Sequence, residues 1–214
     1  MPKNRSKKEI AYQAIKQAII NGELEPGRLY TITEISEKFT VGRTPAREAL
    51  VILSSEGLVV PIPRSGYQVK PISAQDLMEI FHLRRVLEVE AVGLAAERIT
   101  ESEIAILEDN NRQEQDLAKS LGSNESTDKH RKGFLLNLGF HLTIAKASSN
   151  NRLADQIENL LTELERVLVN DPYIAEPQQH REIIDCLKNR DKHGSQEVMK
   201  KHLEDTQNRT SSRF

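Results

Sequence analysis

Residues 31–58 read TITEISEKFTVGRTPAREALVILSSEGL, and this stretch decides the fold of the first third of the chain. Thr31 and Glu34 have the spacing of a capping box, which predicts that a short helix begins there. A second helix is expected to begin between Gly42 and Thr44, after a tight polar turn. Two short amphipathic helices joined in this way are typical of a helix-turn-helix, whose second helix enters the DNA major groove.

The second of these helices begins with side chains that suit contact with DNA. Arg43 is placed for a bidentate pair with O6 and N7 of a guanine, which discriminates against other bases by about 1–3 kcal/mol. Arg47 lies one turn further along and is expected to reach a base edge or a phosphate. Thr44 is expected to be a phosphate ligand or the helix N-cap. The alternative for all three is a solvated helix face.

The segments around this stretch complete a winged helix-turn-helix. Apolar residues recur at helical spacing over residues 8–21, which predicts a helix that stops at Gly22. The segment ELEPGRLY is expected to be a turn. The segment LVVPIPRSGYQV predicts two short strands around residues 64–66. Three helices and a hairpin wing therefore form a DNA-binding domain over residues 1–72.

Helical periodicity continues from Pro71 to the end of the chain, and strand signals disappear. Ser73 and Asp76 are spaced to cap the first of these helices. The expected helices lie near residues 74–98, 101–120, 128–148, 151–169, 176–188 and 195–209, with breaks at 121–127, 148–151, 170–172 and 189–194. The chain is therefore predicted to be mainly α, with an all-α six-helix effector and dimerisation domain over residues 73–214.

Charge is distributed unevenly between the two expected domains. Residues 1–72 contain 11 Lys and Arg against 7 Asp and Glu, whereas residues 73–214 contain 19 against 25. Only the first domain is charged like a protein that binds a polyanion. A basic N-terminal arm adds cations that either reach phosphates or are merely solvated, namely Lys3, Arg5, Lys7 and Lys8.

Cysteine content and hydropathy indicate where the protein works. The single cysteine, Cys186, excludes an intrachain disulfide and fits a reducing compartment. The N-terminus lacks the apolar core of a signal peptide, and no later run approaches the ~20 apolar residues that span a bilayer. We expect a soluble cytoplasmic protein that has no membrane partner.

Two longer patterns carry a resemblance to a known family. They are PGRLYTITEISEKFTVGRTPAREALVILSSEGLV and, after the wing, HLRRVLEVEAVGLAAERI. With them the chain resembles the GntR family of bacterial transcription regulators. Its C-terminal part is similar to the all-helical effector domain of the FadR-type (FCD) branch, and a six-helix count resembles the VanR-like subgroup.

The resemblance implies a homodimer that binds a two-fold symmetric operator in double-stranded DNA and responds to a small metabolite, and we expect it to be a repressor. In the family pattern, Gly66 at the wing tip enters the minor groove and Arg64 beside it contacts a phosphate. Two positions depart from the pattern. Gly42 replaces a common Ser or Thr, and Thr33 stands where some relatives carry a basic base-reading residue, so the operator sequence does not transfer from relatives.

Three histidines fall on the apolar faces of different expected helices: His141, His180 and His202. They are either core histidines or converging metal ligands, and spacing alone leaves both possibilities open. The resemblance favours a metal, because metal-binding FCD domains carry an Asp/Asn-x-x-x-His pair, matched by Asn137 and His141, and a His in each of the last two helices. Imidazole suits Zn²⁺ or Ni²⁺. Asn137 in place of Asp is a weaker ligand and lowers the expected affinity.

Arg84 interrupts an apolar stripe in the first helix of the second domain and is expected to point inward. A buried guanidinium needs an anionic partner. Glu88, four residues on, is one such partner. A small carboxylate effector is the other, because FCD relatives use an Arg at this position near the cavity. Both interpretations hold if Glu88 orients Arg84 toward the ligand.

Three functions are weighed from these features. The first is a regulator whose operator binding is controlled by a carboxylate held near a divalent metal ion. The second is a regulator for which the metal itself is the signal. The third is an enzyme in which three His ligands activate water. We expect a regulator and not an enzyme, because the sequence shows no general base at motif spacing, no phosphate-binding Gly loop and no nucleophile motif.

Overall fold

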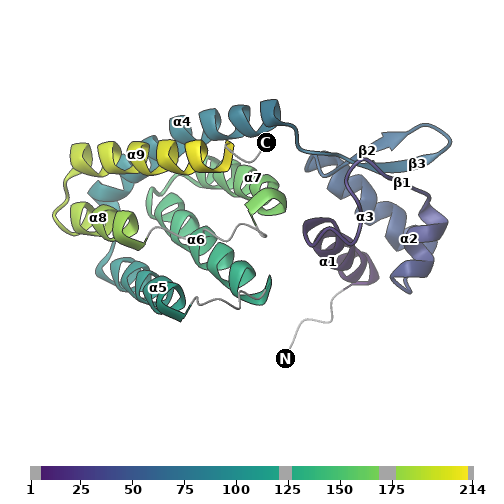
Figure 1. Cartoon of the computed structure of the whole chain (residues 1–214), viewed down its shortest axis with the longest axis horizontal. Helices are drawn as coiled ribbons and strands as arrows, with labels where there is room; N and C mark the ends of the chain where they lie inside the picture. The colour runs from purple at the N-terminus through teal and green to yellow at the C-terminus, as the bar shows by residue number, and fades with distance from the viewer. Residues whose placement is uncertain (1–5, 121–126, 169–176, 212–214) are drawn as a thin grey trace. The chain divides into compact units, whose positions relative to one another are not determined.

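The computed structural model describes residues 6–120, 127–168 and 177–211 (Figure 1). The chain divides into two compact units, Met1–Ile72 and Ser73–Phe214, each of which is described by itself. Several sequence-based expectations lie outside the described residues: the arm residues Lys3 and Arg5, the break at 170–172, and the break at 121–127 apart from Thr127.

Three helices form most of the N-terminal unit, namely α1 (Lys7–Ile20), α2 (Ile32–Lys38) and α3 (Arg43–Ser55). The predicted capping box at α2 is present. The side chain of Thr31 accepts a hydrogen bond from the backbone N–H of Glu34, and the Glu34 carboxylate accepts one from the backbone N–H of Thr31. The cap fixes where α2 begins and therefore also the turn that leads into α3.

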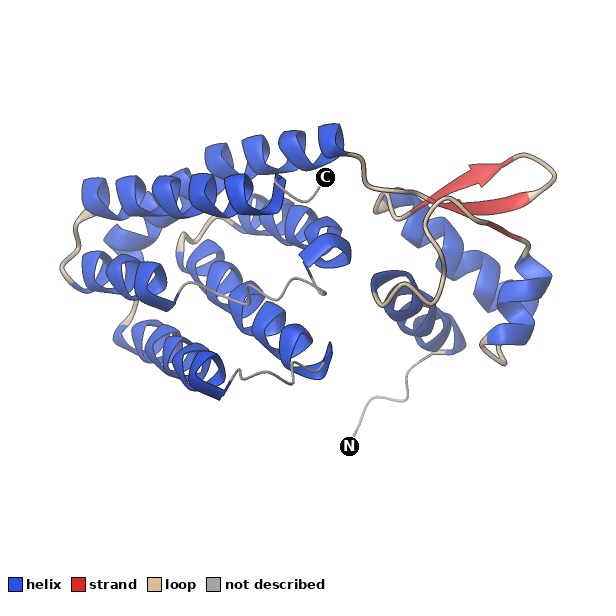
Figure 2. Ribbon diagram, viewed as in Figure 1, coloured by secondary structure: helices blue, strands red, loops and turns tan. Residues whose placement is uncertain are grey.

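The wing is a three-stranded antiparallel sheet of β1 (Leu29–Tyr30), β2 (Val59–Ile62) and β3 (Gly66–Val69), in the order β1-β3-β2 (Figure 2). The predicted hairpin is confirmed, with Ile62 opposite Gly66. Strand β1 was expected to be part of a turn, and that expectation is wrong. Two residues are too few to show strand alternation, and only pairing with β3 makes them a strand.

α3 packs its apolar face into the core of the N-terminal unit. Ala49, Leu50 and Leu53 are buried, as the sequence predicts. Pro45 lies in the first turn of α3, where a missing N–H costs no intrahelical bond. Gly57 follows the helix in the left-handed region, with φ of +76°. Because both ends and the apolar face of α3 are fixed, its opposite face, which carries Arg43 and Arg47, is exposed to solvent.

Six described helices form the C-terminal unit: α4 (Ala74–Arg98), α5 (Glu101–Ser120), α6 (Thr127–Ala147), α7 (Asn151–Leu168), α8 (Pro177–Lys188) and α9 (Lys192–Ser211). The predicted fold class, a winged helix-turn-helix followed by an all-α domain, is confirmed. α9 begins earlier than expected, because the Asp191 carboxylate accepts a hydrogen bond from the Gly194 N–H at 2.9 Å and caps the helix.

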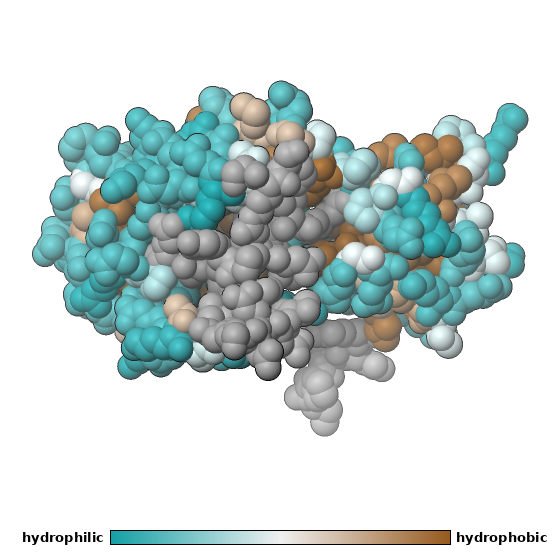
Figure 3. Space-filling view, viewed as in Figure 1, coloured by the Kyte–Doolittle hydropathy of each residue, from teal (hydrophilic) through white to brown (hydrophobic). Residues whose placement is uncertain are grey.

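α4 is the central helix of the C-terminal unit. It lies along α9 and also contacts α6, α7 and α8. The predicted cap of α4 is present, since Ser73 and Asp76 form a capping box. None of the described helices has the length and apolar character needed to cross a bilayer. The coloured surface of this unit in Figure 3 is mostly hydrophilic, whereas hydrophobic surface follows the strands of the wing.

Candidate functional site

The start of α3 presents the predicted DNA-contacting residues to solvent. Arg43, Thr44 and Arg47 are all exposed. Gly42 is the N-cap and makes no side-chain capping bond, so Thr44 is not the N-cap, one of the two roles expected for it. The first N–H groups of α3 therefore have no side-chain acceptor. Uncapped N–H groups at a helix N-terminus form an anion-binding site.

Three arginines of the N-terminal unit carry charges without a partner within the part of the chain that the structure describes. Arg43, Arg47 and Arg64 enter none of the ion pairs or side-chain hydrogen bonds found there, whereas other arginines do. Arg28, for example, pairs with Glu25 in the same unit. Charges without internal partners remain available for an external polyanion.

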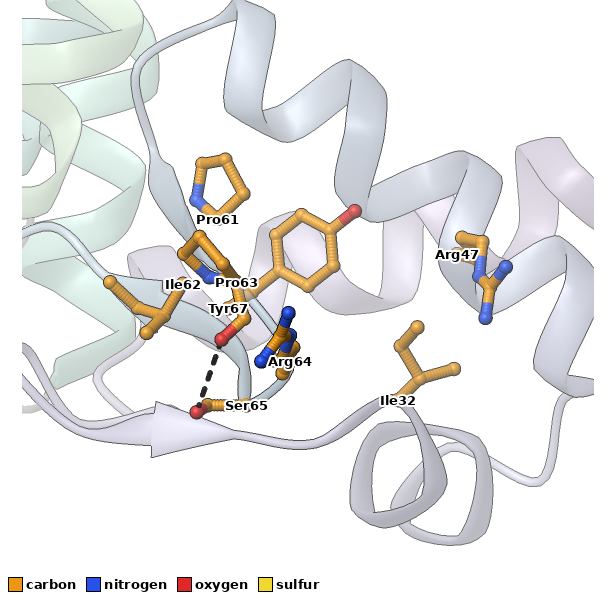
Figure 4. A pocket seen from close by; sticks show the side chains of 9 residues that line it. Ile32, Arg47, Pro61, Ile62, Pro63, Arg64, Ser65 and Tyr67 are labelled. Atoms are coloured by element: carbon orange, nitrogen blue, oxygen red, sulfur yellow. Dashed lines mark hydrogen bonds between the residues drawn. The ribbon is translucent and has the colours of Figure 1, made fainter.

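A groove between α3 and the wing brings two of these arginines together. Arg47 comes from α3 and Arg64 from the turn between β2 and β3, and Figure 4 shows Ile32 between them. The groove has no acidic residue in its lining, which consists of Ile32, Arg47, Pro61, Ile62, Pro63, Arg64, Ser65, Gly66 and Tyr67. It can therefore accept a negatively charged group.

Gly66 has a structural reason to be glycine that is independent of DNA. It begins β3 opposite Ile62, so the tip of the wing is formed by residues 63–65. This differs from the expectation that Gly66 lies at the tip. Its φ is +141°, and a Cβ there would lie 2.2 Å from the carbonyl oxygen of Tyr30. The close approach of the β1 backbone therefore excludes any side chain. Arg64, with φ of +63°, lies at the tip.

The three predicted histidines meet in the interior of the C-terminal unit. His141 comes from α6, His180 from α8 and His202 from α9, and all three are buried. One ligand atom from each lies within 4.8 Å of the others. Asn137, one turn before His141, lies beside them, with its amide nitrogen 3.5 Å from Nε2 of His180. An amide flip exchanges the oxygen and nitrogen of Asn137 and turns the oxygen toward the cluster.

Each histidine has an oxygen atom at its Nδ1. Glu88 Oε2 lies 2.5 Å from Nδ1 of His141, Glu114 Oε2 lies 2.7 Å from that of His180, and Gln179 Oε1 lies 2.8 Å from that of His202. The contacts of His180 and His202 have hydrogen-bond geometry, whereas that of His141 is an ion-pair contact. When Nδ1 carries the proton beside each oxygen, the lone pair is on Nε2.

The facing nitrogens fit a bound cation better than an empty core. Nε2 of His141 lies 3.3 Å from Nε2 of His202. Two lone pairs at this distance repel each other unless a proton or a cation lies between them. Two nitrogens bound to one tetrahedral zinc ion, with Zn–N of about 2.0–2.1 Å, lie about 3.3 Å apart. The donor set and the spacing of this pair therefore fit a divalent ion such as Zn²⁺ or Ni²⁺, and the ligand atoms of all three histidines lie within 4.8 Å of one another.

Two of these outer partners were not predicted from the sequence. Glu114 lies on α5, where it follows Ile104, Leu107 and Asn111 on the buried stripe. A charged residue on an apolar stripe is the same signal that identifies Arg84, and it was present in the sequence. Gln179 offers no comparable signal, because only the packing of α8 against α9 brings it to His202.

Arg84 and Glu88 form a buried ion pair on α4. Nε of Arg84 lies 2.6 Å from Oε1 of Glu88, and both residues are 2% exposed. Burial alone raises the pKa of Glu88, but the charges of Arg84 and His141 outweigh it and lower this pKa to about 2. Nη2 of Arg84 is buried and has no hydrogen-bond partner among the residues that the structure describes. The guanidinium thus retains one donor for an additional anion.

Burial also affects the histidines themselves. It lowers the pKa of His141 despite the opposing charge of Glu88. Burial, with His180 and His141 close by, holds the pKa of His202 well below its usual range. Both shifts favour the neutral imidazole, which is the form that binds a metal.

Comparisons with known families match both units of the chain. The model described as "Bacterial regulatory proteins, gntR family" matches residues 7–69. The model described as "FCD domain" matches residues 79–205, more than half of the chain. The first match contains α3 and the wing, and the second contains the histidine cluster with Arg84 and Glu88.

Individual relatives match over almost the whole chain. The uncharacterized HTH-type transcriptional regulator YdhC of Bacillus subtilis is 30% identical over 90% of this chain and 85% of its own length. The HTH-type transcriptional repressor RspR of Escherichia coli is 27% identical over 91% of this chain and 84% of its own. The solved structure of E. coli McbR/YncC has the same fold, with a TM-score of 0.78 at 23% identity over 98% of this chain and 99% of that one.

Proposed function

We propose that this chain, which belongs to the GntR family of bacterial regulatory proteins and carries an FCD domain, is a homodimeric cytoplasmic repressor. Its binding to the operator is controlled by a small carboxylate, which is held near a divalent metal ion. The prediction of a DNA-binding transcription regulator rather than an enzyme is confirmed by this membership. We also assign the chain to the VanR-like subgroup, on the six described helices of its C-terminal unit.

DNA binding by the N-terminal unit is supported most strongly by the arginines without internal partners. Arg43 at the start of α3 reads a guanine, and Arg47 one turn later reaches a base edge or a phosphate. Thr44 and the uncapped N–H groups of α3 contact a phosphate. Arg64 at the wing tip contacts a second phosphate. Gly66 serves the packing of the wing and supports the position of Arg64.

Dimerisation follows from the size of the DNA-reading surface. A single α3 reads only a few base pairs, which cannot select one site from a genome of competing sequences. Two copies bind two half-sites about one helical turn apart and multiply the selectivity. The similarity to RspR, which is named a repressor, favours repression over activation.

Metal binding is assigned to Nε2 of His141, His180 and His202, with the amide oxygen of Asn137 as a fourth and weaker ligand. A bound ion would supply a positive charge at the centre of the C-terminal unit and open positions for a carboxylate. The two outer carboxylates, Glu88 and Glu114, hold two of the imidazoles in the orientation that binding requires.

Carboxylate binding is assigned to Arg84, with Glu88 as the residue that orients it. The carboxylate would accept a hydrogen bond from Nη2 of Arg84, which donates no hydrogen bond within the described part of the chain, and its charge would be neutralised by the guanidinium. Glu88 contacts both Arg84 and His141, so the anion and metal sites share one side chain. Binding at one site is therefore expected to alter the affinity of the other.

The proposal that the N-terminal unit binds DNA is tested with chromosomal fragments that are selected because they bind to the wild-type protein. Fluorescence anisotropy then compares the selected fragment with a scrambled one for the wild type, Arg43→Ala and Arg112→Ala. Arg112 is an exposed arginine of the C-terminal unit that pairs with Asp109. Arg43→Ala should lose about 1–3 kcal/mol of selectivity, and Arg112→Ala none. Wild-type selectivity in Arg43→Ala would show that α3 does not read the bases.

A further inference from the structure

Glu114 is a buried carboxylate whose ion-pair partner among the described residues is a histidine. It is 1% exposed, and its Oε2 lies 2.7 Å from Nδ1 of His180. Its Oε1 accepts no hydrogen bond from the residues that the structure describes. Within the described ranges, no Lys or Arg forms an ion pair with Glu114. Such a carboxylate is costly to bury unless positive charge is supplied from elsewhere.

The contrast with Glu88 shows what is missing. Glu88 also contacts an imidazole of the cluster, but Arg84 neutralises it at 2.6 Å. Among the described residues, the polar contact found for Glu114 is the one with Nδ1 of His180, and Nε2 of that imidazole lies beside Asn137 at the cluster. A cation at the centre of the three histidines would therefore bring positive charge to the far side of the imidazole that Glu114 contacts.

The ring of His180 is held on two sides. Phe140 stacks on it with ring centroids 3.8 Å apart and an interplanar angle of 7°. Glu114 fixes the rotation of the ring within that plane through Nδ1. Phe140 contributes no charge, so the negative charge beside His180 comes from Glu114.

We propose that Glu114 is a positioning residue that sets the affinity of the histidine cluster for a divalent cation. It holds His180 with Nε2 toward the ion, and it supplies the negative charge that the neutral amide of Asn137 does not. This inference rests on the proposed metal site and adds to it a residue from α5. Its consequence is that the net charge around the site, and not only the ligand set, determines how tightly the ion is held.

The test is Glu114→Gln, which keeps the size of the side chain and an oxygen that accepts from His180. Zn²⁺ is titrated into metal-free full-length protein against a competing chelator. We expect binding about 10–100-fold weaker than in the wild type, the usual effect of losing such an outer partner. The control is Glu108→Gln on the same helix, a part-exposed residue paired with Lys188, and it should leave Zn²⁺ affinity unchanged.

Stability in EDTA separates this role from a merely structural one. Without metal, Glu114→Gln removes a buried carboxylate that pairs with no described Lys or Arg, so the variant should be at least as stable as the wild type. A purely structural residue predicts the reverse, with lower stability and unchanged Zn²⁺ affinity, and that result would overturn the proposal.

A second substitution tests the charge itself. Asn137→Asp in the Glu114→Gln background returns a carboxylate to the neighbourhood of His180 and should recover most of the lost affinity. Zn²⁺ affinity of Glu114→Gln within about threefold of the wild type would refute the role of Glu114. His180→Ala distinguishes the two levels of the proposal, because unchanged Zn²⁺ binding in that variant would refute the metal site itself.

Discussion

Replacing Glu88 with Gln is expected to destabilise the C-terminal unit by about 3–5 kcal/mol, because it leaves the buried guanidinium of Arg84 without its anion. The two side chains are 2% and 3% exposed, and the ion pair measures 2.6 Å. The pKa of Glu88 gives a second measure. Burial raises it, but Arg84 and His141 lower it to about 2, which corresponds to roughly 3 kcal/mol in favour of the ionised folded state.

The assay is urea unfolding in EDTA, followed by far-UV circular dichroism at several pH values. A lowered pKa contributes stability above the unfolded value of about 4.3, and this stability is lost as the pH falls toward about 2. The free-energy difference between the wild type and Glu88→Gln should therefore be large at neutral pH and shrink below about pH 4.

The matched control is Glu97→Gln on the same helix. Glu97 pairs with Lys192 at 2.9 Å, but the two side chains are about half exposed and solvent screens the pair, so its loss should change the stability far less than the loss of Glu88. Equal stability of Glu88→Gln and the wild type at neutral pH would refute the reasoning. A free-energy difference that stays constant down to pH 3 would also refute it, because the loss would not come from the charge.

Three further predictions concern the sites. His141→Ala with His180→Ala should lower the Zn²⁺ content measured by elemental analysis and abolish stabilisation by Zn²⁺, because two of three imidazole ligands are lost; unchanged content would make them core histidines. Gly66→Ala should destabilise the N-terminal unit by at least about 2 kcal/mol in urea unfolding, because its Cβ meets Tyr30. Gly27 also has a positive φ, but a Cβ there would meet no described atom within 4 Å, so Gly27→Ala is the control. An equal loss of stability in the two variants would contradict the clash at Gly66. Arg64→Ala should weaken binding to selected and scrambled DNA alike. It should also reduce the slope of log affinity against log salt concentration by about 1, as for one lost phosphate contact. A loss of affinity confined to the selected fragment would mean that Arg64 reads a base.

The helices were predictable from the sequence because their signals are local. The capping boxes at Thr31 and Ser73 give two helix starts directly. Strand β1 was not predictable, because its two residues become a strand only through pairing with β3. The packing constraint on Gly66 was not predictable for a similar reason. Its neighbour, the carbonyl oxygen of Tyr30, lies far from it in sequence.

The histidine cluster was predictable in part. Spacing placed His141, His180 and His202 on apolar faces, and Arg84 broke an apolar stripe. Which atoms meet depends on how α4, α5, α6, α8 and α9 pack, so Gln179 could not be found from the sequence. Glu114 could have been, because it interrupts the stripe of α5 as Arg84 interrupts that of α4.

The most direct measurement of regulated DNA binding is the dissociation constant for a selected chromosomal fragment with Zn²⁺ present and with lactate, malate or gluconate added in separate titrations. We predict that at least one carboxylate changes this constant by about 5–150-fold in the wild type. The same carboxylate should have no effect in the variant that carries both His141→Ala and His180→Ala. A change produced by Zn²⁺ alone would make the metal itself the signal. An identical dissociation constant under all these conditions, in both proteins, would contradict control of the operator by the histidine cluster and Arg84.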